Sequence, residues 1–424
     1  MKAIIVGGGL AGLASTWALE KHGYECTLLE ASDKIGGRMR STQIEEYIVD
    51  EGFHVLHTAY PTLERWFDLK QLELAPMNPA TSLITPSTGK IQTLGDPFRS
   101  PSMLFPSLLT SGPWNALRML RWRLKSKKRD LERSMDQPTT TMDEGFKSMG
   151  FSQTFRERFL HPLFAGITLD ELRRERTSFA SFTWSAMSHG EMTMPKNGIQ
   201  AVPQQLYDHI SQGTIRYKVK VTSISESEVR LEHGEKLKAD LVVIATPQHV
   251  ANIWLGKDTP TLRKQTATFV FECDESPISK PRLLLNRDYG EKDQHVLHVH
   301  VPTLLHQSKR HLVVATVLGE TASKHQEEKV QNVISSELRQ WFGQQTNEWR
   351  FLTSTYVDYA LPTDEVMGEG RERLSLIHDG VYYVGDHTMH PSVHGTLRSV
   401  ERLLDHLNIP LPLHSQSKGT TSSE

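Results

Sequence analysis

Residues 3–12 read AIIVGGGLAG, an apolar run that leads directly into three consecutive glycines. The apolar residues 3–6 predict a buried strand, and the Ala- and Leu-rich residues 10–22 predict a helix that Gly23 ends. Residues 25–30 (ECTLLE) predict a second strand. This strand–helix–strand order is typical of a parallel sheet with covered faces, so we expect an α/β fold.

Gly7, Gly9 and Gly12 match the pattern G-x-G-x-x-G between this strand and this helix. The first glycine allows a tight turn, the second lets a pyrophosphate approach the backbone, and the third lets the helix pack closely on the strand. At the start of the helix, Leu10 and Ala11 would present unpaired N–H groups to the phosphates. The alternative is an ordinary Gly-rich turn. Because the strand and the helix flank it correctly, we interpret the pattern as part of a Rossmann-type dinucleotide site.

Glu30 stands 18 residues after Gly12, at the end of the second predicted strand. A carboxylate there can accept hydrogen bonds from both hydroxyls of an adenosine ribose, and it disfavours a 2′-phosphate. The alternative is a solvated charge at a strand end. Gly36 and Gly37 offer a second close approach to the backbone, and Arg38 adds a fixed cation. The spacing E-x(5)-G-G-R resembles a hallmark of the flavoprotein amine oxidase and phytoene desaturase superfamily, which implies FAD rather than NAD.

Two further blocks resemble the same superfamily. The stretch VTSI that begins at Val221 is similar to the strand whose backbone contacts adenine. The block VYYVGDHTMHPSVHGTLRSVERLL is similar to the C-terminal flavin signature. The resemblance implies that Asp386, after Gly385, hydrogen-bonds the ribityl chain, and that Gly395 and Thr396 lie by the isoalloxazine ring. Members with an attached flavin carry a cysteine in this block and this chain has none there, so we expect FAD to be held noncovalently.

The stretch VDEGFHVLHTAYPTLERWF resembles the carotenoid-desaturase branch of the superfamily, where Gly52, His54 and Tyr60 match the pattern. The squalene-associated desaturases have a similar segment. The chain departs from its relatives at Leu56 and His57, where aromatic residues are frequent, and at His394, where Asn or Glu is frequent. These departures concern the flavin face, where the substrate would bind.

The resemblance implies an FAD-dependent oxidoreductase that abstracts a hydride from a largely apolar substrate, such as a polyisoprenoid. The sequence does not identify the proton acceptor; His54 and His394 are weak catalytic candidates because they stand in flavin-adjacent blocks, and a structural role is commoner for such histidines. One alternative is an amine oxidase or a protoporphyrinogen-oxidase-like enzyme on the same scaffold. An alternative of another class is a flavin-binding scaffold protein without turnover.

The segment 97–129 contains no Asp or Glu, and its basic residues alternate with apolar ones. On a helical wheel Leu117, Leu120 and Leu124 form one stripe, with basic side chains beside it. Such a segment could lie on a membrane surface and admit an apolar substrate from lipid. It could equally be a solvated basic helix packed on the substrate domain, and the sequence leaves both interpretations open.

Composition narrows the remaining function classes. A formal net charge of −2 and a pI of about 6.9 give no footprint for nucleic acid. The chain has two cysteines, Cys26 and Cys273, which exclude a disulfide framework. Because we see no leader and no long apolar run, we expect a cytoplasmic protein, and attachment to a membrane surface stays open. His298 and His300 share one face of a predicted strand. Because no third ligand is evident, we expect no metal site there and interpret the pair as an exposed strand face.

Strand signals return in the middle and near the end of the chain, which predicts a discontinuous domain organisation. We predict an FAD-binding domain assembled from residues 1–75, 196–255 and 370–410. The same reading gives an inserted α+β substrate domain from residues 76–195 and 256–369, followed by a disordered polar tail, residues 411–424.

Overall fold

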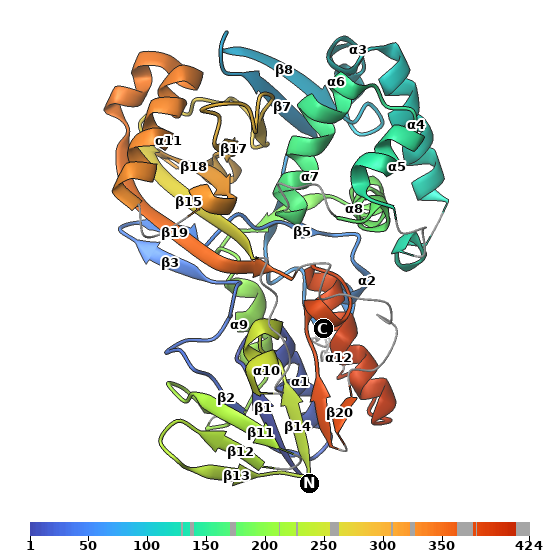
Figure 1. The fold of residues 1–424 in the computed structure, drawn as a ribbon, viewed down its shortest axis with the longest axis vertical. Helices are drawn as coiled ribbons and strands as arrows, with labels where there is room; N and C mark the ends of the chain where they lie inside the picture. The colour runs from blue at the N-terminus through green and yellow to red at the C-terminus, as the bar shows by residue number, and fades with distance from the viewer. Residues whose placement is uncertain are drawn as a thin grey trace, which may run out of the picture.

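The computed structural model describes residues 1–128, 130–135, 140–169, 175–211, 213–225, 228–254, 263–306, 308–322, 327–362, 376–378 and 380–412. In these residues, two large sheets organise two halves of the molecule, and the lower half in Figure 1 holds the first strand and the last helix. The predicted α/β class is confirmed. Most of the predicted tail, from residue 413 onward, lies outside the described residues.

The sheet of the lower half has six strands in the order β10-β2-β1-β14-β21-β20. β1 pairs in parallel with both β2 and β14, and β14 pairs in parallel with β21. The strands therefore come from three segments that lie far apart in the sequence. Their bounds are β1 Lys2–Val6, β2 Glu25–Leu29, β10 Ile215–Arg216, β14 Leu241–Ile244, β20 Leu376–His378 and β21 Val381–Tyr383. The domain boundaries that we inferred from the sequence stay predictions.

Both faces of this sheet are covered, which explains the unbroken apolar runs of its strands. Ile5 and Val243 belong to the core that the helices α1 (Leu10–Lys21), α9 (Ala201–Tyr207) and α12 (Val393–His406) share. Ile4 and Val242 belong to the opposite core. The elements on that side are α10 and a three-stranded sheet, with bounds α10 Gln248–Trp254, β11 Val221–Ser225, β12 Glu228–Leu231 and β13 Lys236–Lys238.

The second large sheet has seven strands in the order β19-β15-β18-β17-β16-β7-β8. One face packs against α11 (Glu327–Phe342) through Val313, Ala315 and Ile334. The opposite face is covered by the hairpin β3–β4 (Ser41–Ile44 and Tyr47–Asp50) and by α7. The strand bounds are β7 Ala80–Thr85, β8 Lys90–Gly95, β15 Lys264–Cys273, β16 Leu284–Asn286, β17 Val296–His300, β18 His311–Leu318 and β19 Arg350–Leu361.

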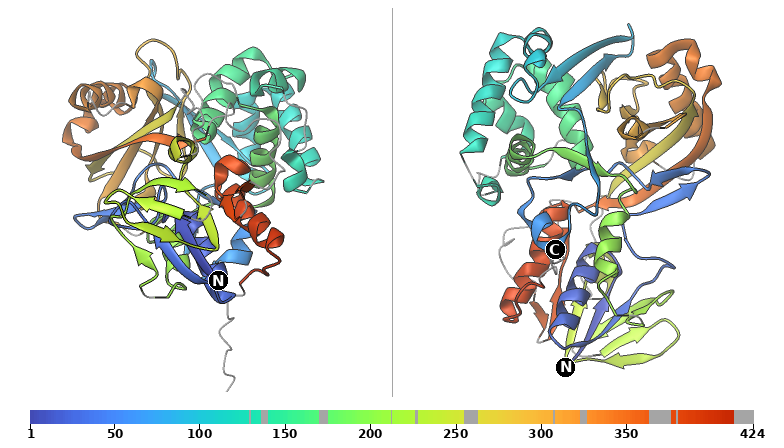
Figure 2. Two further views of the ribbon diagram at one scale, coloured as in Figure 1. Left: turned by 60° about the horizontal axis from the view of Figure 1, so that its bottom comes forward. Right: turned by 180° about the vertical axis from the view of Figure 1, so that it is seen from behind.

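A group of helices stands beside the seven-stranded sheet, as the view from behind shows (Figure 2). Its core is aromatic, with the rings of Trp122 and Trp184 stacked 4.6 Å apart. The segments that connect it to the lower half are α2 (Pro61–Trp66) and a small sheet of β5 (Leu56–His57), β9 (Met192–Pro195) and β6 (Leu74–Pro76). The helices are α3 Leu104–Ser111, α4 Pro113–Lys127, α5 Met142–Ser148, α6 Gln153–Phe155, the π-helical turn Arg156–Leu160, α7 His161–Thr168 and α8 Thr177–His189.

Candidate cofactor site

The first glycine loop leaves no room for side chains at two positions. Gly7 has φ +110°, and a Cβ there would lie 2.8 Å from the carbonyl oxygen of Ala245 at the end of β14. A Cβ on Gly12 would lie 1.9 Å from the carbonyl oxygen of Gly7. The helix α1 begins at Leu10, with Gly9 as its N-cap, so Leu10 and Ala11 supply first-turn N–H groups that have no intrahelical acceptor. The loop therefore presents bare backbone and a helix N-terminus.

The second glycine loop packs directly on the first. The Gly36 N–H donates to the Gly8 carbonyl oxygen at 2.9 Å, and Gly9 and Gly36 form an isolated parallel bridge. A Cβ on Gly37, whose φ is +58°, would lie 3.1 Å from the Cα of Gly9. The structure thus brings both predicted phosphate-facing loops together, backbone against backbone.

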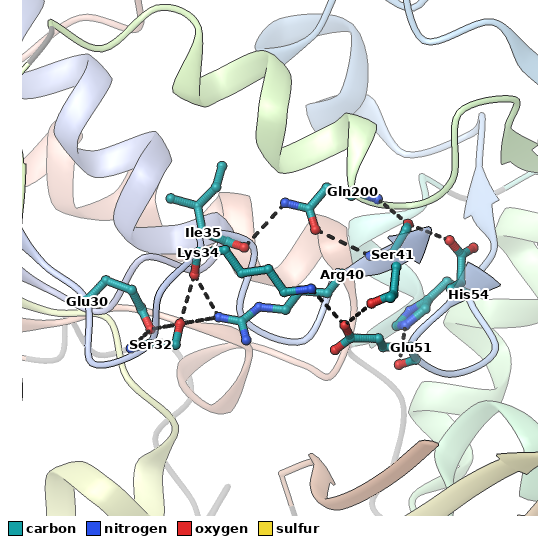
Figure 3. A network of polar contacts seen from close by, with 11 residues as sticks. Glu30, Ser32, Lys34, Ile35, Arg40, Ser41, Glu51, His54 and Gln200 are labelled. Atoms are coloured by element: carbon teal, nitrogen blue, oxygen red, sulfur yellow. Dashed lines mark hydrogen bonds and ion pairs between the residues drawn. The ribbon is translucent and has the colours of Figure 1, made fainter. Parts of the chain in front are cut away.

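Glu30 lies where β2 ends and is held in a polar network (Figure 3). Its Oε2 accepts the Gly8 N–H at 2.6 Å, and its Oε1 accepts the N–H of Ser32 at 2.8 Å and the Ser32 hydroxyl at 2.6 Å. Arg40 stands 3.8 Å from Oε1. A carboxylate oxygen has two lone pairs, so Oε2 can still accept a ribose hydroxyl. Our sequence analysis missed Ser32 and Arg40; the position of Arg40, two residues after the G-G-R pattern, was the available signal.

Val221 is placed near the same end of the sheet. It is buried and begins β11, and the preceding Val219 donates its N–H to the Glu30 carbonyl oxygen at 2.9 Å. The backbone that precedes Val221 thus runs beside Glu30, where the adenosine half of a dinucleotide would lie.

Arg38 joins the second glycine loop to the C-terminal block. Its Nη1 and Nη2 donate to Oδ2 and Oδ1 of Asp386, both at 2.8 Å, and Nη1 also donates to the Ala360 carbonyl oxygen at 2.7 Å. Burial alone would raise the pKa of the Asp386 carboxyl, but the charge of Arg38 and the hydrogen bonds from His387 and Arg38 hold that pKa well below its usual range. Asp386 is therefore a buried carboxylate in a fixed orientation.

The C-terminal block is a rigid turn followed by a capped helix. Gly385 has φ +139°, and its N–H donates to the Ser399 hydroxyl at 2.8 Å. Ser392 caps α12 by accepting the Gly395 N–H at 2.9 Å, and a Cβ on Gly395 would lie 2.2 Å from the His390 carbonyl oxygen. Thr396 already donates its hydroxyl proton to the Ser392 carbonyl oxygen. Thr396 would therefore meet a flavin ring through its backbone or its methyl group.

Several buried polar atoms beside the first glycine loop or near Arg38 and Asp386 have no hydrogen-bond partner in the described part of the chain. They are Thr246 Oγ1, Tyr359 Oη, Tyr383 Oη and His387 Nε2. Thr246 flanks Gly7, and the Tyr383 and His387 rings lie 4.1 Å apart. Buried groups of this kind are expected where a ligand completes the hydrogen bonding. Bare backbone at one end and unpaired polar atoms at the other fit a dinucleotide that extends between the two glycine loops and the Gly-Asp turn.

Residues 10–402 match the sequence profile of the family described as flavin containing amine oxidoreductase. The chain belongs to this family. Its cofactor is therefore FAD, and the protein is an FAD-dependent oxidoreductase, as the E-x(5)-G-G-R spacing predicts. When bound, FAD supplies an acceptor for a hydride. The glycine loops, Glu30 and Asp386 are the residues that would hold it.

Two curated relatives match short stretches of the chain. The chain is 39% identical over 70 residues to a carotenoid phi-ring synthase of Chlorobaculum tepidum, covering 16% of this chain and 11% of that protein. It is 48% identical over 52 residues to a 4,4′-diapolycopen-4-al dehydrogenase of Metabacillus indicus, covering 12% and 11%. Each match thus spans about a tenth of the relative's length.

Solved structures share the fold over nearly the whole oxidoreductase. An oxidoreductase from Methanosarcina mazei superposes with a TM-score of 0.72 at 16% identity, covering 96% of this chain and 100% of that one. A fatty acid isomerase from P. acnes superposes with a TM-score of 0.66 at 14% identity, covering 95% and 98%. At such low identity the likeness concerns the fold alone.

The two candidate histidines of the oxidoreductase have structural contacts. His54 Nε2 lies 3.4 Å from the Glu51 carbonyl oxygen, and burial lowers its pKa against the opposing charge of Asp50. His394 Nδ1 lies 3.0 Å from the Thr62 hydroxyl, and its ring stacks on Tyr60. These contacts do not assign the proton acceptor.

Our prediction that His298 and His300 form an exposed strand face was wrong. Their side chains are buried, and both rings lie 4.7 Å from the Phe53 ring. The segment that contains Phe53 covers this face of the sheet, which the strand sequence alone could not reveal. In the part of the chain that the structure describes, no group of three His, Cys, Asp or Glu residues could hold a metal ion.

Proposed function

We propose that this oxidoreductase removes hydrogen from a largely apolar substrate, with a polyisoprenoid as the favoured class. The observation that carries the proposal is a cavity of about 580 Å³ among the helices and β8. This volume suits a small-molecule site. The lining is mostly apolar and includes Leu104, Leu117, Met119, Leu120, Phe159 and Trp184.

The position of the cavity connects it to the cofactor segment. Met192 lines it and belongs to β9, and Met192 pairs with His57 of β5. His57 follows shortly after Gly52, Phe53 and His54, on the segment that continues from the second glycine loop. An apolar substrate in the cavity would therefore lie against β9, which pairs with the segment that follows the second glycine loop. The apolar wall would keep water away from the reacting carbon.

Anaerobic reduction of the bound flavin tests the substrate class. We expect a polyisoprenoid to bleach the flavin absorbance, and the electrons to pass to oxygen or a quinone on re-oxidation. The family also suggests amines, and the alternative of a porphyrinogen remains an outcome of the same test. Bleaching by amines or porphyrinogens alone would contradict the proposal. Bleaching by none of them, with photoreduction only, would favour a flavin-binding scaffold.

We further propose that the mouth of this cavity docks on a membrane surface. Exposed apolar side chains stand on α3, on α4 and just before α3, which are segments that line the cavity: Phe98 (62% exposed), Leu104 (55%), Phe105 (70%), Leu109 (66%) and Trp114 (70%). Phe98 and Leu104 also line the cavity. On a water-exposed surface such a patch is unusual and points to a lipid or a partner.

The charge beside the patch favours an anionic bilayer. Arg121, Lys125, Lys127 and Lys128 are exposed on or just after α4, whereas Arg123 is paired with Asp96. The Leu stripe of α4 faces the cavity mouth, because Leu117 and Leu120 line the cavity. Arg129, the last residue of the predicted basic segment, lies outside the described residues. Among the helices in the described ranges, none is long and apolar enough to cross a membrane.

A further inference from the structure

Three polar side chains form a row across the seven-stranded sheet. Thr268 of β15 pairs with Thr316 of β18, and Thr316 pairs with His298 of β17. Paired residues of neighbouring strands project from the same face of a sheet. His300, two residues after His298, extends the row along β17. We refer to Thr268, Thr316, His298 and His300 as the polar row.

The polar row is buried and unsatisfied. The four residues are 1%, 2%, 1% and 4% exposed, respectively. The hydroxyls of Thr268 and Thr316, both ring nitrogens of His298, and Nδ1 of His300 have no hydrogen-bond partner in the described part of the chain. A buried polar group without a partner lowers the stability of the folded state. Several of them side by side are therefore unexpected unless a ligand or ordered water pairs with them.

The face that carries the polar row is the face turned away from α11. Val313, Ala315 and Val317 of β18 pack on the α11 side, so Thr316 projects to the other. There the Phe53 ring contacts both histidines, and a Cβ on Gly166 of α7 would lie 3.5 Å from His298 Nδ1. The helix α7 lies beside β17 (Figure 1).

Two segments link the polar row to the proposed site. Phe53 lies on the segment that continues from the second glycine loop, which would hold FAD. The helix α7 carries Leu163, which lines the apolar cavity one turn before Gly166. Phe53 and α7, which both lie against the polar row, thus join it to the cofactor segment and to the cavity wall.

The chemistry of the row suits a neutral oxygen group. Burial lowers the pKa of His298 to about 3, so the ring is uncharged at neutral pH and offers one donor and one acceptor. Each threonine hydroxyl can also donate and accept. Neutral groups of this kind can pair with an alcohol or a carbonyl, but they supply no positive charge to offset a carboxylate.

We propose that the polar row binds the hydroxyl or carbonyl oxygen of an otherwise apolar substrate. This inference rests on the proposed function for the apolar remainder, and it adds a fixed polar anchor that sets the position of the chain over the cofactor. The substrate class becomes an apolar alcohol, aldehyde or ketone rather than a pure hydrocarbon or an acid.

Binding of matched ten-carbon probes to the FAD-loaded protein tests the proposal. We expect decan-1-ol and decan-2-one to bind at least tenfold tighter than decane or decanoate, measured by titration calorimetry and by the change in flavin absorbance. His298→Phe and Thr316→Val should each remove that preference and leave decane binding unchanged. Three results would overturn the proposal. All four probes could bind equally, the alcohol and the ketone could fail to bind, or the preference could survive both substitutions.

The melting temperatures of three threonine variants give a second test of the proposal. Thr268→Val and Thr316→Val remove unpaired hydroxyls, so the melting temperature should stay the same or rise. Thr266→Val is the matched control, because the Thr266 hydroxyl donates to the Val317 carbonyl oxygen at 3.1 Å and its loss should lower the melting temperature. A loss of stability in all three variants would show that the row is internally satisfied and would contradict a ligand site.

The outcomes separate this inference from the proposed function. If hydrocarbons reduce the flavin but the alcohol preference is absent, the apolar substrate class stands and the polar anchor fails. If amines alone reduce the flavin, the proposed function fails whatever the probes show.

Discussion

Arg38 and Asp386 stand 348 residues apart in the sequence and form a two-pronged ion pair with both N–O distances at 2.8 Å. Through this pair the second glycine loop is fixed to the C-terminal Gly-Asp turn. This contact therefore joins the two parts of the FAD site. Asp386 is buried, so a replacement would leave the guanidinium without its counter-charge.

We predict that Asp386→Asn lowers the free energy of unfolding by about 3 kcal/mol, the scale of a broken buried ion pair, and also weakens FAD retention. Urea unfolding of the apoprotein measures the first effect. The matched control is Glu45→Gln, because Glu45 makes a similar two-pronged pair with Arg350 but both side chains are about half exposed. It should cost much less, because solvent screens the charges of an exposed pair. Equal effects of the two substitutions would count against a buried, coupled pair.

Gly9→Ala should impair FAD binding, whereas Gly12→Ala should impair folding. A Cβ on Gly9 would meet only the Cα of Gly37, at 3.9 Å, so the apoprotein should fold normally; the added methyl group would occupy the place of the pyrophosphate. A Cβ on Gly12 would clash with the Gly7 carbonyl oxygen, so the fold itself should suffer. Circular dichroism and flavin absorbance after purification distinguish the two. Normal FAD content in Gly9→Ala would refute the assigned position of the phosphates.

Glu30→Ala should weaken FAD binding by about 1.5–3 kcal/mol, the scale of a hydrogen bond to a charged group. Part of the loss would come from the freed Gly8 N–H, which now donates to Glu30. Fluorescence titration of the apoprotein with FAD measures the change, and Glu25→Ala on the exposed start of β2 is the control. Unchanged affinity would exclude Glu30 as a ribose ligand.

The apoprotein should lose stability as the pH falls from about 6.5 towards 4. Burial lowers the pKa of His394 to about 4, and the charges of Arg65 and Arg398 act in the same direction, against the opposing charge of Glu401. The Glu132 carboxylate also lies 3.5 Å from Nε2. Because the unfolded chain binds the proton more tightly in this window, stability is present above it and is lost on acidification. In a plot of the urea midpoint against pH, His394→Gln should make the slope shallower without abolishing it, because buried histidines such as His298 contribute in the same direction. An unchanged slope would mean that His394 is protonated in the folded state.

Vesicle flotation should separate a membrane surface from a solvated basic helix. We expect Phe105→Ser, Leu109→Ser and Trp114→Ser, combined, to abolish binding to anionic vesicles, and Arg121→Gln with Lys125→Gln to weaken it by about 1 kcal/mol per charge. Ile253→Ser and Val333→Ser remove exposed apolar side chains elsewhere and should change nothing. If the triple variant instead dissociates a dimer, or if wild type does not float, the membrane proposal is wrong.

The sequence predicted the features that the local backbone dictates. Gly7 and Gly12 are required by the steric limits of one strand–turn–helix unit, so the pattern is visible in a few adjacent letters. Glu30 is predictable for the same reason, since its distance from the loop is fixed by one helix and one strand. The α/β class follows from these short-range patterns.

What the sequence could not provide is contact between distant segments. The pairing of Arg38 with Asp386 depends on how β19 and the C-terminal block fold against the second glycine loop. The burial of His298 depends on Phe53, which lies on another segment and covers its strand. The apolar cavity likewise arises from α3, α4 and α8 together, and none of these helices has a motif that indicates it.

The most direct test of the central claim is the flavin content of the purified protein, measured by visible absorbance before and after heat denaturation. The account predicts one FAD per chain, released into solution by denaturation, and close to none in Gly9→Ala. Protein that stays colourless after saturation with FAD, or flavin that remains attached to the denatured chain, would contradict it.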